Sequence, residues 1–152
     1  MTPGVMKNIT ALVTGGATSI GRSICFALAE QGAHVLIADV DAKEGQKTCA
    51  DILAEGHRAE FIPCDVTKRE QVSQAIDRPN RLDCVVNNAG IAGPNCELTG
   101  VGEDEFDRVL AINVKAVFLV MQAAIRRMRA QGGGAIVNVA SVGGVVGTAG
   151  TS

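Results

Sequence analysis

The sequence predicts a single α/β domain in which a parallel β-sheet lies between two layers of helices. Short runs of β-branched residues alternate with longer segments of helical period, which is the pattern of repeated strand-helix-strand units. The chain has 152 residues, of which 47% are hydrophobic and 20% are charged, a composition typical of one packed globular core. We therefore treat residues 1–152 as one domain with a doubly wound sheet.

Five apolar, β-branched runs are expected to form the strands: residues 9–14, 34–38, 59–64, 82–87 and 135–140. Helical period or helix start and stop signals mark the segments between them: residues 19–31, 41–56, 67–78 and 103–130. The tail from Val142 to Ser152 is rich in glycine, and no pattern in it requires order.

Local signals mark the ends of the second and third helices. Asp41 with Glu44, and Thr67 with Glu70, have the spacing of capping boxes, in which the first side chain accepts a hydrogen bond from the helix backbone. Pro79 disfavours helix in the residue before it, so we expect a turn there, ahead of the fourth strand.

Charge, targeting signals and cysteines exclude several classes of partner. The net charge is −2 and the basic runs are short, which argues against binding to nucleic acid. Residues 1–7 lack the apolar core of a secretory signal, and no later apolar run is uninterrupted enough to span a bilayer. We expect a cytoplasmic protein with no membrane partner.

The five cysteines include no Cys-x-x-Cys pair, so we predict no metal site and interpret them as small buried apolar residues.

The last helical segment, residues 103–130, carries apolar side chains in nearly all directions. A helix of this kind contacts more than one surface, because the sheet covers only one of its sides. A second subunit is the natural partner for the other side, so we expect a homo-oligomer formed through this helix.

A glycine-rich turn follows the first predicted strand, with the sequence Thr-Gly-Gly-Ala-Thr-Ser-Ile-Gly over residues 14–21. A strand that turns through glycines into a helix presents unpaired backbone N–H groups and the positive end of the helix dipole, which suit a pyrophosphate. An ordinary glycine turn has a similar pattern. The residue that ends the second strand favours the phosphate interpretation.

That residue is Asp39, which stands where an adenosine ribose would lie. Its carboxylate can accept hydrogen bonds from both ribose hydroxyls, and it would repel a 2′-phosphate. Neither Thr18 nor Val40 is basic, so NAD is favoured over NADP, although Arg22 could turn toward a phosphate. Asp39 could instead cap the next helix, but Asp41 already has that role.

Further motifs follow in order: Asp-Val at residues 65–66, Asn-Asn-Ala-Gly at 87–90 and Ile-Val-Asn-Val-Ala-Ser at 136–141. With the glycine turn and Asp39, they resemble the short-chain dehydrogenase/reductase family over nearly the whole chain. The resemblance implies a Rossmann-type, three-layer α/β/α fold with about five strands in the order 3-2-1-4-5, the family's C-terminal strands being missing. It also implies an NAD(P)-dependent oxidoreductase that transfers hydride between the nicotinamide and a secondary alcohol or ketone.

The resemblance also implies which residues bind the cofactor: Gly15, Ser19, Ile20, Gly21, Asp39, Asp65, Val66, Asn87, Ala89 and Gly90. Those of the glycine turn would surround the pyrophosphate, and those at 65–66 would flank the adenine. Those at 87–90 would line the ribose and nicotinamide.

Two further residues are implied for catalysis. Asn113 would hold a water of the proton relay, and Ser141 would hydrogen-bond the substrate oxygen. Without the surrounding motifs, Asn113 would be interpreted as an ordinary polar helix residue and Ser141 as a turn residue at a strand end.

The chain departs from the family pattern at three points. Ser19 stands where the family has glycine or alanine, and the segment between Asp65 and Asn87 is about one helical turn shorter than the family norm. The family's tyrosine, which exchanges a proton with the substrate, and its lysine would lie beyond Ser152, and this sequence contains no tyrosine. We therefore expect a fragment of a longer enzyme, inactive on its own.

Two other functions stay open at this stage. The absence of tyrosine favours a non-catalytic dinucleotide-binding module, which would pair with a full-length relative through residues 103–130. A methyltransferase also binds adenosine with a glycine turn and an acidic strand end, but it has no need of the motifs at 87–90 and 136–141. On the dehydrogenase interpretation the partner is a small-molecule alcohol or carbonyl compound, which the sequence does not identify further.

Overall fold

The computed structural model describes residues 4–146 and contains one five-stranded parallel sheet. The strands are β1 (Thr10–Thr14), β2 (His34–Asp39), β3 (Arg58–Pro63), β4 (Cys84–Asn87) and β5 (Ala135–Asn138). Their order across the sheet is β3-β2-β1-β4-β5, which confirms the predicted doubly wound topology. The order reverses between β1 and β4, so the loops that follow these two strands diverge and leave a crevice at their carboxyl ends.

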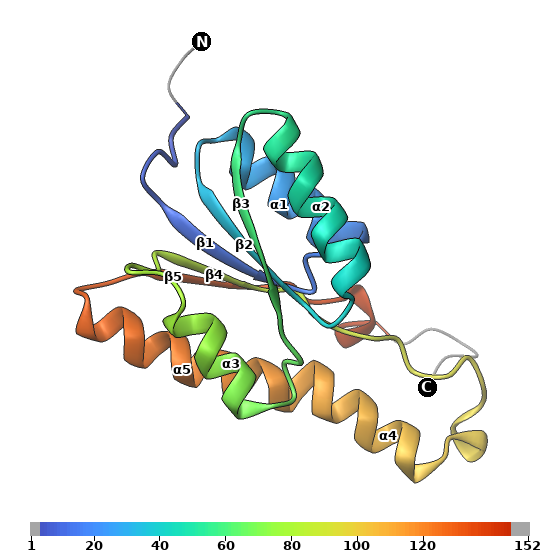
Figure 1. Cartoon of the computed structure of the whole chain (residues 1–152). Helices are drawn as coiled ribbons and strands as arrows, with labels where there is room; N and C mark the ends of the chain where they lie inside the picture. The colour runs from blue at the N-terminus through green and yellow to red at the C-terminus, as the bar shows by residue number, and fades with distance from the viewer. Residues whose placement is uncertain (1–3, 147–152) are drawn as a thin grey trace.

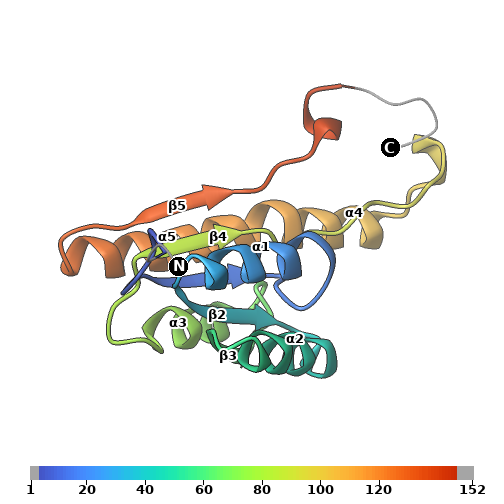
Figure 2. The same ribbon diagram turned by 90° about the horizontal axis from the view of Figure 1, so that it is seen from above.

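The helices lie in two layers (Figures 1 and 2). They are α1 (Ser19–Glu30), α2 (Ala42–Ala54), α3 (Arg69–Asp77), α4 (Glu103–Leu110) and α5 (Ala116–Ala130), with a π-helical turn η2 (Ala111–Lys115) and two 3₁₀ turns, η1 (Leu98–Gly100) and η3 (Val142–Gly144). One layer holds α1 and α2, and the other holds α3 and α5. The α/β/α architecture predicted from the sequence is therefore present.

Alternating side chains of the central strands build the two halves of the core. Leu12 and Leu36 face the layer of α3 and α5, where they pack in one cluster with Val120. Val13 and Ile37, one position further along the same strands, face α1 and α2. Because successive side chains of a strand point to opposite faces, a strand covered on both sides must be apolar throughout. This explains the continuous apolar runs of β1 and β2.

The predicted helix caps have different outcomes. The Asp41 carboxylate accepts a hydrogen bond from the Glu44 N–H at 3.0 Å, which confirms it as the N-cap of α2. The expected cap at Thr67 is wrong, because α3 begins one residue later, after Lys68. The Thr67 hydroxyl instead donates to Asp65 Oδ1 at 2.7 Å, so it is not turned toward the helix. The hydrogen bond between Thr67 and Asp65 has replaced the expected capping interaction of Thr67 with the helix backbone.

The segment predicted as one helix, residues 103–130, consists of α4, the turn η2 and α5 in unbroken succession. Among the described residues it is long and apolar enough to cross a membrane by length and composition, with a window of mean hydropathy 1.7, which we did not expect from the sequence. Its Ala116, Val120, Ala124 and Met128 nevertheless belong to the core cluster under the sheet. We therefore assign it as a core helix with one uncovered side.

Part of the tail lies outside the described residues. Val142–Gly144 forms the 3₁₀ turn η3, although no sequence pattern there required order. Residues 1–3 and 147–152 are not described.

Candidate dinucleotide-binding site

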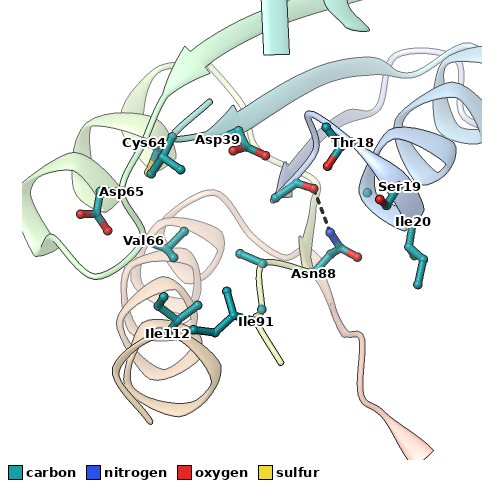
Figure 3. A pocket seen from close by; sticks show the side chains of 15 residues that line it. Thr18, Ser19, Ile20, Asp39, Cys64, Asp65, Val66, Asn88, Ile91 and Ile112 are labelled. Atoms are coloured by element: carbon teal, nitrogen blue, oxygen red, sulfur yellow. Dashed lines mark hydrogen bonds between the residues drawn. The ribbon is translucent and has the colours of Figure 1, made fainter. Parts of the chain in front are cut away.

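A cavity of about 430 Å³ opens at the carboxyl ends of the strands, in front of the N-terminus of α1. Figure 3 shows Ser19 and Ile20 on one side of it, and Val66, Ile91 and Ile112 on the other, with Asp39 between them. The residues that line it are Gly15, Thr18, Ser19, Ile20, Gly21, Asp39, Val40, Cys64, Asp65, Val66, Asn88, Ala89, Gly90, Ile91 and Ile112. Doubly wound sheets bind their ligands at this edge.

The glycine turn packs backbone against backbone. A Cβ atom at Gly21 would lie 1.9 Å from the carbonyl oxygen of Gly15. Gly15 has φ +65°, and a Cβ atom there would lie 2.8 Å from the Cα of Ala89. Only glycine allows such close approach together with this backbone conformation. The start of α1 is thereby held against the loop that follows β4.

Two side chains that the sequence reasoning missed hold this turn. Asn88 Nδ2 donates to the carbonyl oxygens of Thr14 at 3.1 Å and of Gly15 at 3.0 Å, and the bond to Gly15 is drawn in Figure 3. Thr14 Oγ1 accepts from the N–H groups of Asn88 and Ala89, both at 3.1 Å. The signal was available, because Thr14 opens the glycine motif and Asn88 lies inside the Asn-Asn-Ala-Gly motif.

The first turn of α1 provides donors for an anionic group. Thr18 is the N-cap, its side chain makes no capping hydrogen bond, and the turn contains no acidic residue. The first N–H groups of a helix have no acceptor within the helix. Ser19, Ile20 and Gly21 line the cavity, so N–H groups of this first turn are available there to an anionic group.

Ser19 adopts a backbone conformation that favours glycine. Its φ is +50°, in the left-handed region, and it opens α1. The sequence reasoning identified Ser19 as a departure from a glycine position but did not predict that the backbone would retain a glycine conformation there. The conformation costs a residue with a Cβ atom on the order of 1 kcal/mol.

The Asp39 carboxylate is fixed by one backbone N–H group on each oxygen. Oδ2 accepts from Ala17 and Oδ1 accepts from Asp41, each at 3.0 Å. A carboxylate oxygen can accept more than one hydrogen bond, so both oxygens retain capacity toward the cavity. Two vicinal hydroxyl groups of a ribose would match this arrangement.

Arg22, which the sequence left free to turn toward a phosphate, is bound to α2. Its Nη1 donates to Thr48 Oγ1 at 3.0 Å and its Nη2 pairs with Asp51 Oδ2 at 3.1 Å. The guanidinium also lies over the ring of Phe26, with its central carbon 4.6 Å from the ring centroid. In this structure Arg22 is not among the residues that line the cavity.

Asp65 and Val66, which are predicted to flank the adenine, line the cavity together with Cys64. Asp65 Oδ1 accepts from the Thr67 N–H at 2.9 Å, which shapes the loop after β3. Burial, followed by the nearby carboxylates of Asp65 and Asp39, raises the pKa of the Cys64 thiol to about 11. The thiol is therefore protonated near neutral pH and acts as an apolar lining group.

Three of the cysteines, Cys25, Cys64 and Cys84, are buried, in agreement with the sequence prediction, whereas Cys49 and Cys96 are half-buried. Burial raises the pKa of the Cys25 thiol to about 12, with Asp39 adding to the rise. Within residues 4–146, no three His, Cys, Asp or Glu side chains gather closely enough to hold a metal ion.

Nine of the ten residues predicted for cofactor binding line the cavity, and Asn87 is the exception. Its Nδ2 donates to Asn138 Oδ1 at 2.8 Å, so its side chain faces β5. Its own Oδ1 is buried and has no hydrogen-bond partner in the described part of the chain. Asn88, the next residue, lines the cavity in its place.

Asn113 lies in the turn η2 and binds the loop after β4. Its Nδ2 donates to the Ile91 carbonyl at 2.8 Å, and its Oδ1 accepts from the Ile91 N–H at 2.9 Å. A Cβ atom at Gly90 would lie 3.3 Å from the same Oδ1. The structure therefore places Asn113 beside the predicted nicotinamide end, where its amide positions the cavity wall.

Ser141 follows β5 and is exposed. Its Oγ accepts a hydrogen bond from the Gly143 N–H at 3.2 Å and caps the turn η3. The strands β4 and β5 are neighbours, so Ser141 leaves the sheet at the same edge as the Asn-Asn-Ala-Gly loop. The side chain does not line the described cavity.

A model of the short chain dehydrogenase family matches residues 9–152. The chain belongs to this family. Family membership favours the dehydrogenase interpretation over the methyltransferase alternative, because the match includes the motifs at 87–90 and 136–141. The short-chain dehydrogenases are oxidoreductases, and the fold described above agrees with the match.

Similar proteins with named activities include alcohol dehydrogenases. An uncharacterized oxidoreductase of Thermotoga maritima is 40% identical over 138 residues, 90% of this chain and 55% of that protein. A cyclopentanol dehydrogenase of Comamonas sp. is 38% identical over 153 residues, covering 98% of this chain and 61% of the relative. The crystal structure of an NAD⁺-bound xylitol dehydrogenase superimposes with a TM-score of 0.92 at 34% identity, covering 97% of this chain and 58% of that one. The chain thus spans little more than half the length of these relatives.

Proposed function

We propose that this chain is the dinucleotide-binding domain of a dehydrogenase that transfers hydride between NAD and a secondary alcohol or ketone. The observation that carries the proposal is the cavity that joins the N-terminus of α1 to the Asp39 carboxylate. One end provides unpaired N–H groups for a pyrophosphate, and the other provides a fixed carboxylate for a ribose. The nicotinamide of the bound cofactor would supply or accept the hydride.

NAD is the proposed cofactor, with NADP bound more weakly. The Asp39 carboxylate would lie against the 2′ position of the ribose, where a phosphate would bring two like charges together. The adjoining lining residues Thr18 and Val40 carry no positive charge to compensate. The similar xylitol dehydrogenase was crystallised with NAD⁺, which supports a nicotinamide cofactor.

For the chemical step we propose that Ser141 hydrogen-bonds the substrate oxygen and that Asn113 supports the proton path. Asn113 is already bonded to both the N–H and the carbonyl oxygen of Ile91, so it also holds the cavity wall near the reacting ring. Since the 152-residue chain contains no tyrosine, we propose that it binds cofactor without turnover by itself. The relatives with named activities are dehydrogenases, which does not favour the alternative of a non-catalytic dinucleotide-binding module.

We also propose that the protein forms a homo-oligomer through residues 103–130. Phe106, Leu110, Val114 and Phe118 follow one another at helical spacing, and each is between 41% and 60% exposed. A row of exposed apolar side chains on one helix face is typical of a subunit interface. A cytoplasmic location remains our sequence-based prediction.

The proposed cofactor is tested by titration calorimetry of the folded chain with NADH and with NADPH. We expect NADH to bind more tightly than NADPH. Asp39→Asn is expected to weaken NADH binding about tenfold, because a neutral amide accepts hydrogen bonds from the ribose less strongly than a carboxylate. It should also reduce the preference for NADH over NADPH, because the amide does not repel a 2′-phosphate. Flat titrations with both coenzymes on folded protein would contradict the proposal.

The proposed reaction is tested with a chimera in which residues 1–152 are continued by the C-terminal part of the cyclopentanol dehydrogenase relative. The chimera is expected to reduce ketones with NADH. Ser141→Ala in it should lower kcat about 100-fold with little change in the affinity for NADH, as for other groups that stabilise a developing oxyanion. No turnover across a broad panel of ketones and alcohols, with NADH still bound, would count against the dehydrogenase assignment.

A further inference from the structure

We propose that Thr48 and Arg22 are positioning residues that set the preference for NAD over NADP, by holding Ala17 of the glycine turn and, through it, the Asp39 carboxylate. This inference rests on the proposed function. Neither residue belongs to the predicted site, and Thr48 lies on α2, outside every motif of the sequence. They are connected to Asp39 through Ala17 of the glycine turn, whose N–H group and carbonyl oxygen each make a hydrogen bond.

Ala17 is the residue that links the two. Its N–H group donates to Asp39 Oδ2 at 3.0 Å, and its carbonyl oxygen accepts from Thr48 Oγ1 at 2.8 Å. Both Ala17 and Thr48 are only 1% exposed, so water cannot replace either partner without a rearrangement. The orientation of the Ala17 backbone is therefore decided jointly by Asp39 and Thr48.

Arg22 fixes the direction of the Thr48 hydroxyl. A hydroxyl has one proton to donate, and a guanidinium can only donate. Since Arg22 Nη1 lies 3.0 Å from Thr48 Oγ1, the hydroxyl must accept from Arg22 and give its proton to the Ala17 carbonyl. The sequence of bonds from Arg22 through Thr48 and Ala17 to Asp39 therefore has one possible polarity.

The consequence at Asp39 is a carboxylate that cannot rotate freely. The glycine turn holds Oδ2 through Ala17, and the start of α2 holds Oδ1 through the Asp41 N–H. The lone pairs that remain on the two oxygens are the ones that can accept hydrogen bonds from a ligand. Their direction is set by α2, which positions the Asp41 N–H directly and the Ala17 N–H through Thr48. A pair of ribose hydroxyls can use that direction, whereas a 2′-phosphate meets a negative charge that cannot turn away.

The same bonds hold the Arg22 guanidinium on α2, so it is not free to turn toward a 2′-phosphate. Arg22 uses both terminal nitrogens on α2, with Thr48 and with Asp51. The ion pair with Asp51 is partly exposed, with side-chain exposures of 37% and 41%, so it contributes little by itself. We therefore assign the larger effect to the buried Thr48 hydroxyl and the smaller one to Arg22.

The test compares the NADPH/NADH ratio of dissociation constants in the parent chain, Thr48→Val and Thr48→Ser, by titration calorimetry. Thr48→Val keeps the shape and removes the hydroxyl. We expect it to weaken NADH binding about tenfold and NADPH binding less than about threefold, since a loosened carboxylate loses the ribose hydroxyls but repels the phosphate less. Thr48→Ser retains a hydroxyl at this position, so its ratio of the NADPH and NADH dissociation constants should equal that of the parent chain.

A purely structural role predicts something different, because a generally weakened fold lowers the affinity for both coenzymes by the same factor. An unchanged ratio in folded Thr48→Val, or a ratio that Thr48→Ser does not restore, would overturn the inference while leaving the proposed function intact. A parent chain that binds neither coenzyme would overturn both.

Arg22→Met gives an independent measurement if Thr48→Val does not fold. It keeps an apolar stem near Phe26 and removes the donor that orients the hydroxyl, so the ratio should fall about threefold. Lys47→Met is the matched control, because it removes one positive charge from the exposed side of α2 beside Thr48. Equal effects of Arg22→Met and Lys47→Met would show that net charge alone is responsible and would overturn the inference.

Discussion

The two edge strands of the sheet, β3 and β5, are covered very differently. Beside β3 lies α2, which approaches so closely that a Cβ atom at Gly45 would lie 2.2 Å from the ring of Phe61. In contrast, β5 stands at the opposite edge with little beside it (Figure 2), and Val137 is 50% exposed. Within the described residues, four of the six positions of β3 are half-buried, whereas three of the four positions of β5 are exposed.

The difference separates two parts of the candidate site. The residues proposed to bind the adenosine and pyrophosphate follow β1, β2 and β3, where the carboxylates of Asp39 and Asp65 accept hydrogen bonds from neighbouring backbone N–H groups. Ser141, proposed for the chemical step, follows β5, and within residues 4–146 its hydroxyl is bonded to the Gly143 N–H. The proposed cofactor contacts therefore follow half-buried or buried strands, whereas Ser141 stands at the end of a largely exposed strand.

The largest expected effect tests the difference in packing between the interior strand β2 and the edge strand β5. Leu36→Ala on β2 removes a side chain with no exposed surface and should lower the free energy of unfolding by about 2–5 kcal/mol. Val137→Ala on β5 should cost about 1 kcal/mol or less, because half of that side chain is already exposed. Urea denaturation measures both. Similar losses at the two positions would show that β5 is as well covered as β2.

The second largest effect is expected from a substitution in the glycine turn. Gly21→Ala places a methyl group 1.9 Å from the fixed Gly15 carbonyl, so it should cost about 1–3 kcal/mol and abolish NADH binding. Gly102→Ala is the matched control on the other half of the chain, since a Cβ atom there meets no atom within 4 Å. Calorimetry and urea denaturation give the two readouts. Retained NADH binding in Gly21→Ala would refute the close-packed turn.

The uncovered side of the long helix is tested by Phe118→Ser. Phe118 is 56% exposed, so its loss should change the stability of the monomer by less than about 1 kcal/mol. The same substitution should dissociate the proposed homo-oligomer, because it interrupts the exposed apolar row. Size-exclusion chromatography with light scattering measures the mass. A parent chain that stays monomeric at high concentration would contradict the proposal.

A smaller, stabilising effect is expected at Ser19. Ser19→Gly removes the strain of a left-handed residue with a Cβ atom, partly offset by the greater freedom of glycine in the unfolded chain, and should add about 0.5 kcal/mol. Ser23→Gly, the same change one turn later inside α1, should instead cost about 0.5–1 kcal/mol. Thermal and urea denaturation of the two variants should move in opposite directions; movement in the same direction would argue against strain at Ser19.

The smallest expected effect is a pH dependence from His34 at the start of β2. Burial, followed by the charge of Arg58, lowers the pKa of His34 below its usual 6.5. The unfolded chain therefore takes up this proton first, and stability should decline as the pH falls below about 6.5 toward the lower pKa of the folded state. His34→Gln should flatten that part of the curve in urea denaturation. An unchanged slope would show that another group titrates.

The strand order was implied by the resemblance to a known family. The sequence pattern by itself determined the alternation of strands and helices, the glycine turn and the acid at the end of β2. These features are local or periodic: alternation of strand and helix, glycines where a Cβ atom has no room, and Asp41 as a cap three residues before its donor. Local geometry acts over a few residues, so the sequence pattern carries it directly.

Tertiary structure decided which side chains meet across the chain. Asn87 and Asn88 are adjacent, yet one turns to β5 and the other to the cavity, because neighbouring residues at a strand end point in opposite directions. Thr67 donates to Asp65 instead of capping α3. Arg22 and Thr48 are 26 residues apart, and only the packing of α1 against α2 brings them to either end of one hydrogen bond. Such contacts depend on how elements pack, which no local pattern of residues specifies.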